Sequence, residues 1–364
     1  MLDLSVLKNE ERAIYTLRSL YHSYGYLPFK MSKFEEYDLY VRNKDFLVSD
    51  RIITFNDTDG KLLALKPDVT LSIIKNTAPE EGALQKVYYN ENVYRVSGST
   101  GQFKEIMQTG IECVGDISLS DVFEVVYLAA KSLSLISPDF VLDISHMGIL
   151  SAIIDTASEN ELFKKEITTL IAEKNAHEAE RVCREYSVSS EYTEIIKTLA
   201  STGGDIKTVI EKLSPLCKTE SARIAYGELA ELAELLLSTE FADKIRIDFS
   251  VVNNMSYYNG IVFRGFLSGI CQGVLAGGEY GKLVSEMGKG SGAIGFALYL
   301  DLLSELDRDM AEYDADVLLL YSDDTAPSEV ARKKEEIILG GESVFSARKI
   351  PDKMKFSRTV RIGG

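Results

Sequence analysis

The chain has 364 residues, of which 45% are hydrophobic and 26% are charged, an ordinary composition for a globular protein of one large domain with smaller ones. Its formal net charge is −16. This charge argues against a nucleic-acid binder, because phosphate neutralisation by basic residues supplies most of the affinity of such proteins.

The four cysteines are isolated from one another and from the three histidines, and they form no CxxC pair. A zinc site is therefore not expected. The opening residues MLDLSVLKNEER have no basic segment followed by an apolar one, and no apolar run approaches the roughly 18 residues of a membrane span. We expect free thiols, no cofactor, no membrane contact and a cytoplasmic location.

The first 66 residues predict two helices followed by a β-hairpin. Apolar residues at helical spacing indicate a helix over residues 5–24, and a shorter helical pattern covers residues 33–41. The segments IITFND (52–57) and KLLALK (61–66) predict two strands, and the Asp-Gly pair between them is typical of a tight turn.

A third helix is expected after Pro67, running to about Asn76. Asp68 and Thr70 stand where this helix begins, so each is a candidate cap for its first turn. Taken alone, the cap is the simpler interpretation of both residues.

The stretch Val87–Gly115 predicts two strands joined by a polar, glycine-containing loop. Arg95, Gln108 and Glu112 fall on the strands rather than in the loop. A guanidinium, an amide and a carboxylate on one sheet face are costly to bury unless they meet each other or a ligand. The pattern therefore indicates either a ligand site or a half-exposed sheet with a solvated face.

The middle of the chain predicts a helix over 119–136, a strand over 140–145, and then a helical region without strands from 146 to 240. Strands return at 244–250, 257–266 and 270–277, and the apolar segment 293–306 predicts a buried helix. The glycine-rich GGEYGKL is weak evidence for a phosphate-binding loop, since it lacks the GxGxxG spacing and no helix is expected after it. A tight turn beside a ligand or strand fits better.

The last 50 or so residues predict one β-α-β unit, with strands at DVLLLY and ESVFSA and a helix over 326–338. A unit of this size has too little core to be stable by itself. Its basic end, SARKIPDKMKFSRTVRIGG, is expected to be a solvated tail.

Four segments, taken in this order, resemble the class II histidyl-tRNA synthetases. LALKPDVT is similar to the family's LRPEGT, and YRVSGSTGQFKEIMQTGIECVG to its second motif. NNMSYYNGIVF and GFALYLDLL resemble its RGLDYYTGTVF signature and its third motif. The resemblance covers residues 5–306 and implies an α+β fold, with an antiparallel sheet flanked by helices. We accordingly expect a synthetase-like core at 1–145 and 241–310, a helical insertion at 146–240, and a short α/β extension at 311–364.

Several positions depart from the family's pattern where cations or polar groups would handle ATP. Leu302 stands at the arginine of the third motif, and Glu279 at the arginine of AGGRYD. Further departures are Ser97, Gln102, Lys104, Asn253 and Ser256, and Ser32 stands at the proline of the first motif. Such groups stabilise charge that develops on the phosphates in the transition state, so their loss predicts a chain that does not aminoacylate tRNA.

The resemblance carries over the family's amino-acid pocket onto this chain. In it Asp68 and Glu112 would hold an α-ammonium, and Arg95 a carboxylate. Gln108 and a tyrosine hydroxyl would bind an imidazole, which makes L-histidine the expected ligand. The full set of expected histidine-binding residues is Asp68, Thr70, Arg95, Gln108, Glu112, Tyr257 and Tyr258.

A chain that keeps the amino-acid pocket but lacks the ATP-handling residues also resembles the synthetase-like regulatory subunit of ATP phosphoribosyltransferase. The LRPDxT motif of that subunit has an aspartate at the position of Asp68. That resemblance implies a subunit that is not itself an enzyme but is required by a short-form catalytic subunit in the first step of histidine biosynthesis. It also implies feedback inhibition by histidine, self-association as a dimer, and a hetero-octamer with the catalytic chain, without tRNA.

Two other interpretations stay open. One is an active histidyl-tRNA synthetase or a related enzyme that adenylates an amino acid. The other is a synthetase-like protein that binds a different partner and keeps the pocket only as a vestige.

Overall fold

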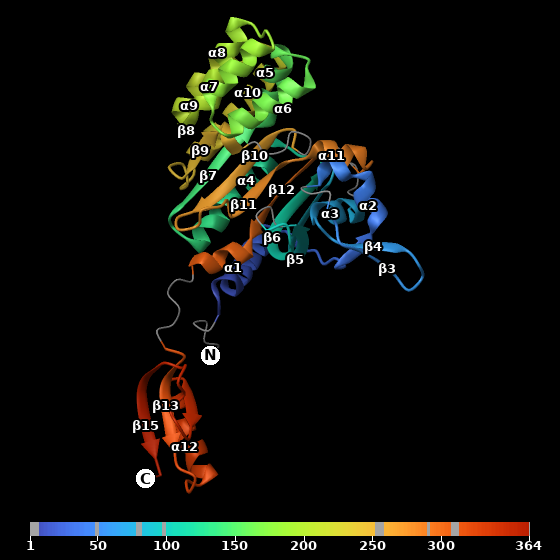
Figure 1. Cartoon of the computed structure of the whole chain (residues 1–364). Helices are drawn as coiled ribbons and strands as arrows, with labels where there is room; N and C mark the ends of the chain where they lie inside the picture. The colour runs from blue at the N-terminus through green and yellow to red at the C-terminus, as the bar shows by residue number, and fades with distance from the viewer. Residues whose placement is uncertain are drawn as a thin grey trace. The chain divides into compact units, whose positions relative to one another are not determined.

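The computed structural model describes residues 7–47, 51–77, 82–96, 100–251, 258–289, 292–306 and 313–363. The chain forms two compact units, Met1–Leu306 and Asp307–Gly364 (Figure 1). In the described ranges, none of the helices is both long and apolar enough to cross a membrane.

A nine-stranded sheet, in the order β1-β5-β6-β12-β11-β10-β7-β9-β8, organises the larger unit. Its pairs are antiparallel except for β1 with β5 and β7 with β9, so the predicted α+β fold with a mainly antiparallel sheet is confirmed. The strands are β1 (Leu27–Pro28), β5 (Leu84–Val96), β6 (Phe103–Gly115), β7 (Phe140–His146), β8 (Gly203–Asp205), β9 (Ile245–Asp248), β10 (Ile261–Leu267), β11 (Leu275–Glu279) and β12 (Gly292–Tyr299).

One face of this sheet is apolar and is covered by α1 (Asn9–Ser23) and α4 (Leu119–Ile136). Ile111 and Cys113 of β6 and Phe296 of β12 are buried against these helices. Ser118 begins α4 as its cap, in a reciprocal capping box with Asp121, which explains why this helix has the predicted bounds. Because side chains alternate along a strand, Glu112 and Gly295 point to the opposite face.

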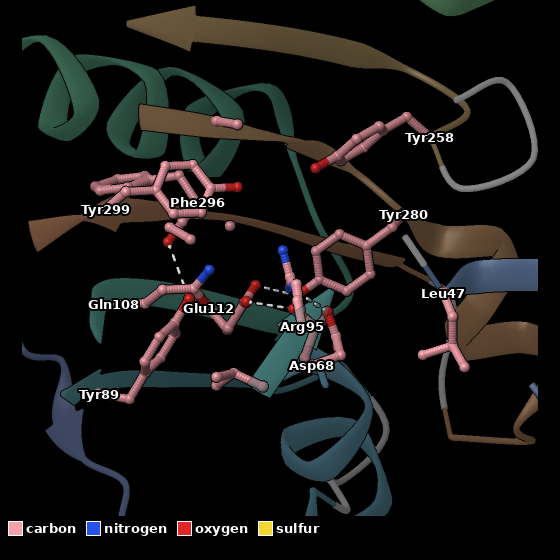
Figure 2. Close-up of a pocket in the computed structure, with 15 residues that line it drawn as sticks. Leu47, Asp68, Tyr89, Arg95, Gln108, Glu112, Tyr258, Tyr280, Phe296 and Tyr299 are labelled. Carbon is pink, nitrogen blue, oxygen red and sulfur yellow. Dashed lines mark hydrogen bonds and ion pairs between the residues drawn. The ribbon is translucent and has the colours of Figure 1, made fainter. Parts of the chain in front are cut away.

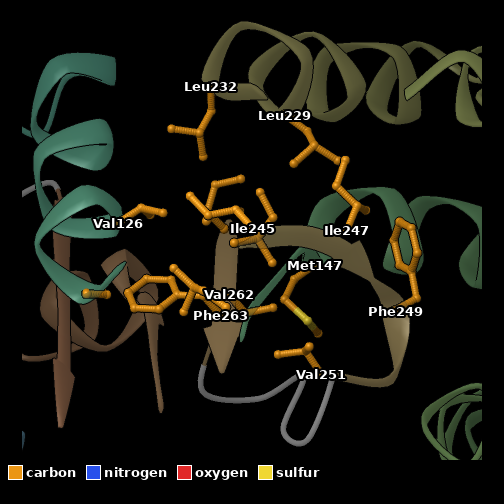
Figure 3. Packing of buried hydrophobic residues seen from close by; sticks show 14 of the residues in the cluster. Val126, Met147, Leu229, Leu232, Ile245, Ile247, Phe249, Val251, Val262 and Phe263 are labelled. Carbon is orange, nitrogen blue, oxygen red and sulfur yellow. The ribbon is translucent and has the colours of Figure 1, made fainter. Parts of the chain in front are cut away.

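Helices from the middle of the chain extend the same core beyond the edge strands. Leu229 and Leu232 of α10 pack over Ile245 and Ile247 of β9 and beside Val126 of α4 (Figure 3). The division into units does not separate residues 146–240 from the rest of the larger unit. A helical insertion over these residues as a separate domain therefore stays a prediction. The helices are α5 (Met147–Ala157), α6 (Glu161–Ala172), α7 (Ala176–Glu185), α8 (Ser190–Ser201), α9 (Ile206–Leu213), the 3₁₀ helix η3 (Ser214–Leu216) and α10 (Glu220–Leu237).

The expectation that this helical region lacks strands is wrong, because β8 pairs with β9 at the sheet's edge. Gly203 lies opposite Asp248, and a β-carbon added at Gly203 would press on the Asp248 carboxylate. Glycine therefore permits the pairing, although glycines are poor indicators of a strand.

A small sheet in the order β2-β4-β3 lies near the N-terminus and includes the predicted hairpin. Its strands are β2 (Phe34–Glu36), β3 (Thr54–Asn56) and β4 (Leu62–Leu65). The helix expected over 33–41 begins only at Tyr37, since Phe34–Glu36 pairs with β4 instead. Beside this sheet lie α2 (Tyr37–Arg42), η2 (Lys44–Phe46) and α3 (Thr70–Asn76).

The buried helix predicted over 293–306 is wrong. Its first half is β12, which pairs with β6 and β11 in the centre of the sheet, and its second half is the 3₁₀ helix η5 (Leu300–Leu306). A short apolar run of this kind does not distinguish a buried strand from a buried helix. The 3₁₀ helix η4 (Phe249–Val251) follows β9. The helix α11 (Gly281–Glu286) begins within the glycine-rich segment GGEYGKL, so the expectation that this segment has no helix after it is wrong.

The smaller unit contains β13 (Ala315–Tyr321), α12 (Pro327–Leu339), β14 (Val344–Ala347) and β15 (Phe356–Ile362). Its parallel sheet has the order β14-β13-β15, and Val317, Leu319 and Ile337 form its core. The expected solvated tail is therefore wrong for residues 356–362, which are a third strand. Whether the unit is stable by itself stays a prediction.

Candidate functional site: a cavity on the sheet face opposite α1 and α4

A cavity of about 320 Å³ lies on the sheet face opposite α1 and α4 (Figure 2). Its floor consists of small residues on neighbouring central strands, namely Ala276 of β11 with Gly295 and Ala297 of β12. A β-carbon added at Gly295 would collide with a Glu112 carboxylate oxygen and with the Ile111 carbonyl oxygen. The cavity thus exists because the floor residues in the middle of the sheet have small side chains or, at Gly295, none.

Glu112 of β6 lies at the deep end of the cavity and is only 2% exposed. Thr70 Oγ1 donates a hydrogen bond to its Oε1 at 2.9 Å, and the Tyr280 hydroxyl donates to its Oε2. Burial is the main reason that the pKa of Glu112 rises to about 8, although both hydrogen bonds lower it. Glu112 is thus a carboxylate whose two oxygens are held by neutral donors.

Asp68 and Arg95 form an ion pair at another wall of the cavity, with Arg95 Nη2 3.4 Å from Asp68 Oδ2. Arg95 Nε also donates to the Pro67 carbonyl oxygen at 2.6 Å. Burial raises the pKa of Asp68, while Arg95 opposes that rise. The backbone N–H of Leu71 donates to Asp68 Oδ1 at 2.9 Å, so Asp68 also caps α3, as one interpretation of the sequence expected.

Gln108 is also 2% exposed and faces the cavity from β6, on the same side of the strand as Glu112 and four residues before it. Its Nε2 is buried without a hydrogen-bond partner among the described residues. A buried amide donor of this kind normally has a partner, so this atom is available to a ligand. The hypothesis of a solvated polar sheet face is therefore not supported for Gln108 or Glu112.

The structure brings together six of the seven residues expected from the sequence around one cavity: Asp68, Thr70, Arg95, Gln108, Glu112 and Tyr258. The seventh, Tyr257, lies outside the described residues. Their role in binding histidine is not tested by their positions and is taken up below as a proposal.

Sequence reasoning missed several aromatic residues of the cavity wall. Tyr280 holds Glu112, while Tyr89 and Tyr299 also line the cavity. Tyr280 and Tyr89 each have a signal in the sequence. Tyr280 belongs to the AGGEYG segment, and Tyr89 lies an even number of residues before Arg95 on β5, so both point to the same face. Tyr299 lies directly opposite Gln108 in the register of β12 and β6, but the helix predicted there concealed this.

Two of the departures from the synthetase pattern have structural roles that differ from binding phosphate. Glu279 accepts a hydrogen bond from the Ile261 backbone N–H at 2.6 Å, and burial raises its pKa. Leu302 packs against the main hydrophobic core. Ser97, Asn253 and Ser256 lie outside the described residues.

The described part of the chain offers little for a metal ion. No group of three or more His, Cys, Asp or Glu side chains within it could hold one. All four cysteines are free, and only Cys271 is exposed.

The family model for histidyl-tRNA synthetases matches residues 2–303. The chain belongs to the histidyl-tRNA synthetase family. Within it, curated relatives named ATP phosphoribosyltransferase regulatory subunit are similar to this chain. The protein from Oceanobacillus iheyensis is 28% identical over 294 residues, which cover 80% of this chain and 72% of the relative. The protein from Ruminiclostridium cellulolyticum is 24% identical over 362 residues, covering 96% and 85%.

Solved structures share the family fold. An ATP phosphoribosyltransferase regulatory subunit/histidyl-tRNA synthetase from Bacillus halodurans has a TM-score of 0.78 at 22% identity, covering 100% of this chain and 97% of the other. A chain of the ATP phosphoribosyl transferase (HisG:HisZ) complex from Thermotoga maritima has a TM-score of 0.62 at 22% identity, covering 80% and 97%. The resemblance predicted from the motifs is thus confirmed.

Proposed function

We propose that this chain is the non-catalytic regulatory subunit of ATP phosphoribosyltransferase and that its cavity senses L-histidine. One observation carries the proposal: the cavity keeps buried groups that suit an amino acid, while positions that would serve ATP are occupied by Leu302 and Glu279 in structural roles. The names of the curated relatives support it independently.

The charges of the cavity complement those of a free amino acid. Arg95 would bind the carboxylate, and Asp68 and Glu112 would share the α-ammonium. The Gln108 amide, which has an unpartnered Nε2, and a tyrosine hydroxyl would bind the imidazole. A volume of about 320 Å³ is at the small end of the range for ligand sites, which favours a ligand of this size over a nucleotide.

The absence of catalysis follows from electrostatics. Transfer of an adenylyl group needs cations where charge develops, and losing one such group commonly costs roughly 10²–10³ in rate. Leu302 is apolar and packs against the core, so it cannot supply such a charge, and Glu279 has the opposite sign. Activity would then belong to a partner chain that binds the substrates.

The proposed partner is a short-form catalytic subunit of ATP phosphoribosyltransferase. A fold shared with a chain of the HisG:HisZ complex supports this choice. We propose a cytoplasmic hetero-octamer in which histidine binding favours an inhibited state, with self-association of this chain as a dimer. The inhibition is limited by the difference in histidine affinity between the two states.

Copurification with a short catalytic chain, followed by an assay of that chain with and without this one, is the direct test. Stimulation of the catalytic chain and its loss on adding histidine are the expected results. Calorimetry of the complex with histidine and with glutamine tests the sensor separately. Stimulation without any histidine binding would remove the sensing role but leave the activating role intact.

A second candidate function, that of an amino-acid adenylating enzyme, is favoured by the match to the synthetase family. Pyrophosphate exchange with ATP and histidine distinguishes the two. Exchange by the purified chain alone would replace the proposed function with this one.

A further inference from the structure

The last residue of β12, Tyr299, is a large side chain at the end of a row of small ones. Side chains alternate along a strand, so the β12 residues that face the cavity are Gly295, Ala297 and Tyr299. Leu298 and Leu300, on either side of Tyr299, are both buried in the main core. This anchoring on the opposite face fixes the direction of the Tyr299 side chain toward the cavity.

Tyr299 lies at the outer end of the cavity, which is the end nearer the loop between β5 and β6. Along β6 the cavity-facing residues run from Glu112 through Gln108 to Lys104 and that loop, and Tyr299 lies opposite Gln108. Arg95 reaches the cavity from the same end, since its backbone pairs with that of Lys104. A ligand at this end would therefore meet a cation and an aromatic ring.

The side chain of Tyr299 faces that of Tyr258 across the cavity. Figure 2 shows the two entering from opposite sides, with their hydroxyl groups pointing toward one another. The Tyr258 ring lies over Gly278, where an added β-carbon would come within 2.8 Å of it. Burial is the main reason that the pKa of Tyr258 is raised, and among its neighbours Tyr299 adds most to the rise. The two rings together limit the space that the sheet face leaves for a ligand.

Beyond Tyr299 the same sheet face opens to solvent. Lys104, four residues before Gln108 on β6, and Asp301, two residues after Tyr299, are both exposed. Tyr299 itself is half-buried, whereas Gln108 and Glu112 are only 2% exposed. The ring thus stands at the boundary between the cavity and the charged surface outside it.

We propose that Tyr299 selects ligands whose carboxyl group is free. In the proposed function Arg95 binds the carboxylate of an amino acid, so a group attached to that carboxyl points to the outer end, where the Tyr299 ring lies. A carboxylate fits beside the ring, but a bulky amide, an ester or a mixed anhydride presses on it. The strand cannot easily give way, because the two leucines that flank Tyr299 are packed in the core.

This inference rests on the proposed function, because it takes the ligand to be an amino acid held by Arg95. It adds the class of ligand that the cavity rejects, namely histidine joined through its carboxyl group to something larger. A repulsive contact of this kind is a common way to distinguish ligands that share most of their groups. The sensor would respond to the free end product and not to its acyl derivatives.

Calorimetry of the purified full chain, alone and with a catalytic chain, tests the selection with three ligands. L-Histidine is the reference. L-Histidinamide and L-histidine anilide both lack the carboxylate charge and differ in size at the same position, so their comparison reports on space alone. On Tyr299→Ala the anilide should gain about 20-fold or more in affinity, whereas histidine and the small amide should change by less than about fivefold.

Three further variants complete the test, and circular dichroism checks that each is folded. Tyr299→Phe keeps the ring and should still reject the anilide, because bulk and not the hydroxyl makes the selection. Tyr299→Leu should give a smaller gain and replaces Tyr299→Ala if that variant does not fold. Leu47→Ala is the matched control, since it enlarges the cavity on the side away from Tyr299 and should not admit the anilide (Figure 2).

An unchanged preference for the small amide over the anilide in both Tyr299→Ala and Tyr299→Leu would overturn the inference. So would an equal gain for the anilide in Leu47→Ala, which would mean that any loosening of the cavity admits it. In both cases histidine binding by the unchanged chain would leave the proposed function intact. If neither histidine nor its amide bound the unchanged chain, alone or in the complex, the sensing role would be lost and the inference with it.

Discussion

Two carboxylates of the cavity are buried to a similar degree but are held in different ways. Asp68 pairs with Arg95, whereas Glu112 receives hydrogen bonds from Thr70 and Tyr280 and has no ion pair in the described part of the chain. The pKa of both is raised by burial, and only at Asp68 does a neighbouring cation oppose the rise. The Asp68 carboxylate thus has a counter-ion within the chain, whereas the described residues give Glu112 only neutral hydrogen-bond donors.

Filling the floor beneath Glu112 should have the largest effect. Gly295→Val places a branched side chain where even a β-carbon meets the Glu112 carboxylate and the Ile111 carbonyl oxygen. We expect a loss of about 3 kcal/mol in the free energy of unfolding and no detectable histidine binding. Urea unfolding and calorimetry measure the two effects.

Gly227→Ala is the matched control, because a β-carbon there meets nothing within 4 Å and the residue lies inside α10. It should stabilise the chain by about 0.5–1 kcal/mol. If Gly295→Val unfolded like the unchanged protein and bound histidine normally, the cavity floor would not position Glu112.

Neutralising the two carboxylates one at a time should change the free energy of unfolding in opposite directions. Asp68→Asn leaves Arg95 without its anion and should lower the free energy of unfolding by about 1–3 kcal/mol. Glu112→Gln removes a group whose ionisation is costly and should stabilise the empty protein above pH 8. Both should weaken histidine binding, Glu112→Gln by roughly 10–100-fold. Equal losses of stability for Asp68→Asn and Glu112→Gln at alkaline pH would contradict the proposed difference between the two carboxylates.

The pH dependence follows from the raised pKa of Glu112, which is about 8 in the folded chain against an ordinary value of 4.5. The stabilisation from its protonated form is fully present below about pH 4.5 and is lost as the pH rises through about 8. Thermal unfolding of the empty protein should therefore show a decline across this window that is absent in Glu112→Gln.

Histidine binding should show the opposite trend. An ammonium favours the ionised carboxylate, so affinity should rise by about fivefold between pH 7 and 8, above the titration of free imidazole near 6.5. Calorimetry in buffers of different ionisation enthalpy should detect proton release. A pH-independent affinity would mean that Glu112 does not receive the ammonium.

The smallest effect is expected for Tyr280→Phe, which removes one donor to Glu112 and keeps the ring. The pKa of Glu112 should rise further, because that hydrogen bond lowers it, and histidine binding should weaken by about fivefold. Tyr127→Phe, which removes an exposed hydrogen bond to Glu240, is the control and should bind normally.

The periodicity and turn signals of the sequence were sufficient to predict the N-terminal hairpin, α4 and the long strand pair β5 and β6. In each, the local pattern agrees with the tertiary environment, as at Ser118, where a capping box marks the start of α4. The polar residues of the candidate site were also predictable, since Gln108 and Glu112 lie on a predicted strand among the apolar residues Ile106, Ile111 and Cys113.

Strand β12 was not predictable for a reason connected with the site. Its cavity-facing positions are Gly295 and Ala297, which are small because the cavity lies over them. Glycine and alanine favour strands weakly, so the site removed the β-branched residues that would have indicated a strand. Tyr280 was missed because its importance depends on a contact with Glu112, 168 residues away.

The small floor residues also show how such a sensor could be made insensitive by engineering. Ala297→Val would add two methyl groups to the floor and leave Asp68, Arg95 and Glu112 themselves unchanged. If the proposed function holds, the variant would fold and assemble but would leave no room for the end product. A cell carrying it would continue to make histidine after its own needs were met, as a production strain requires.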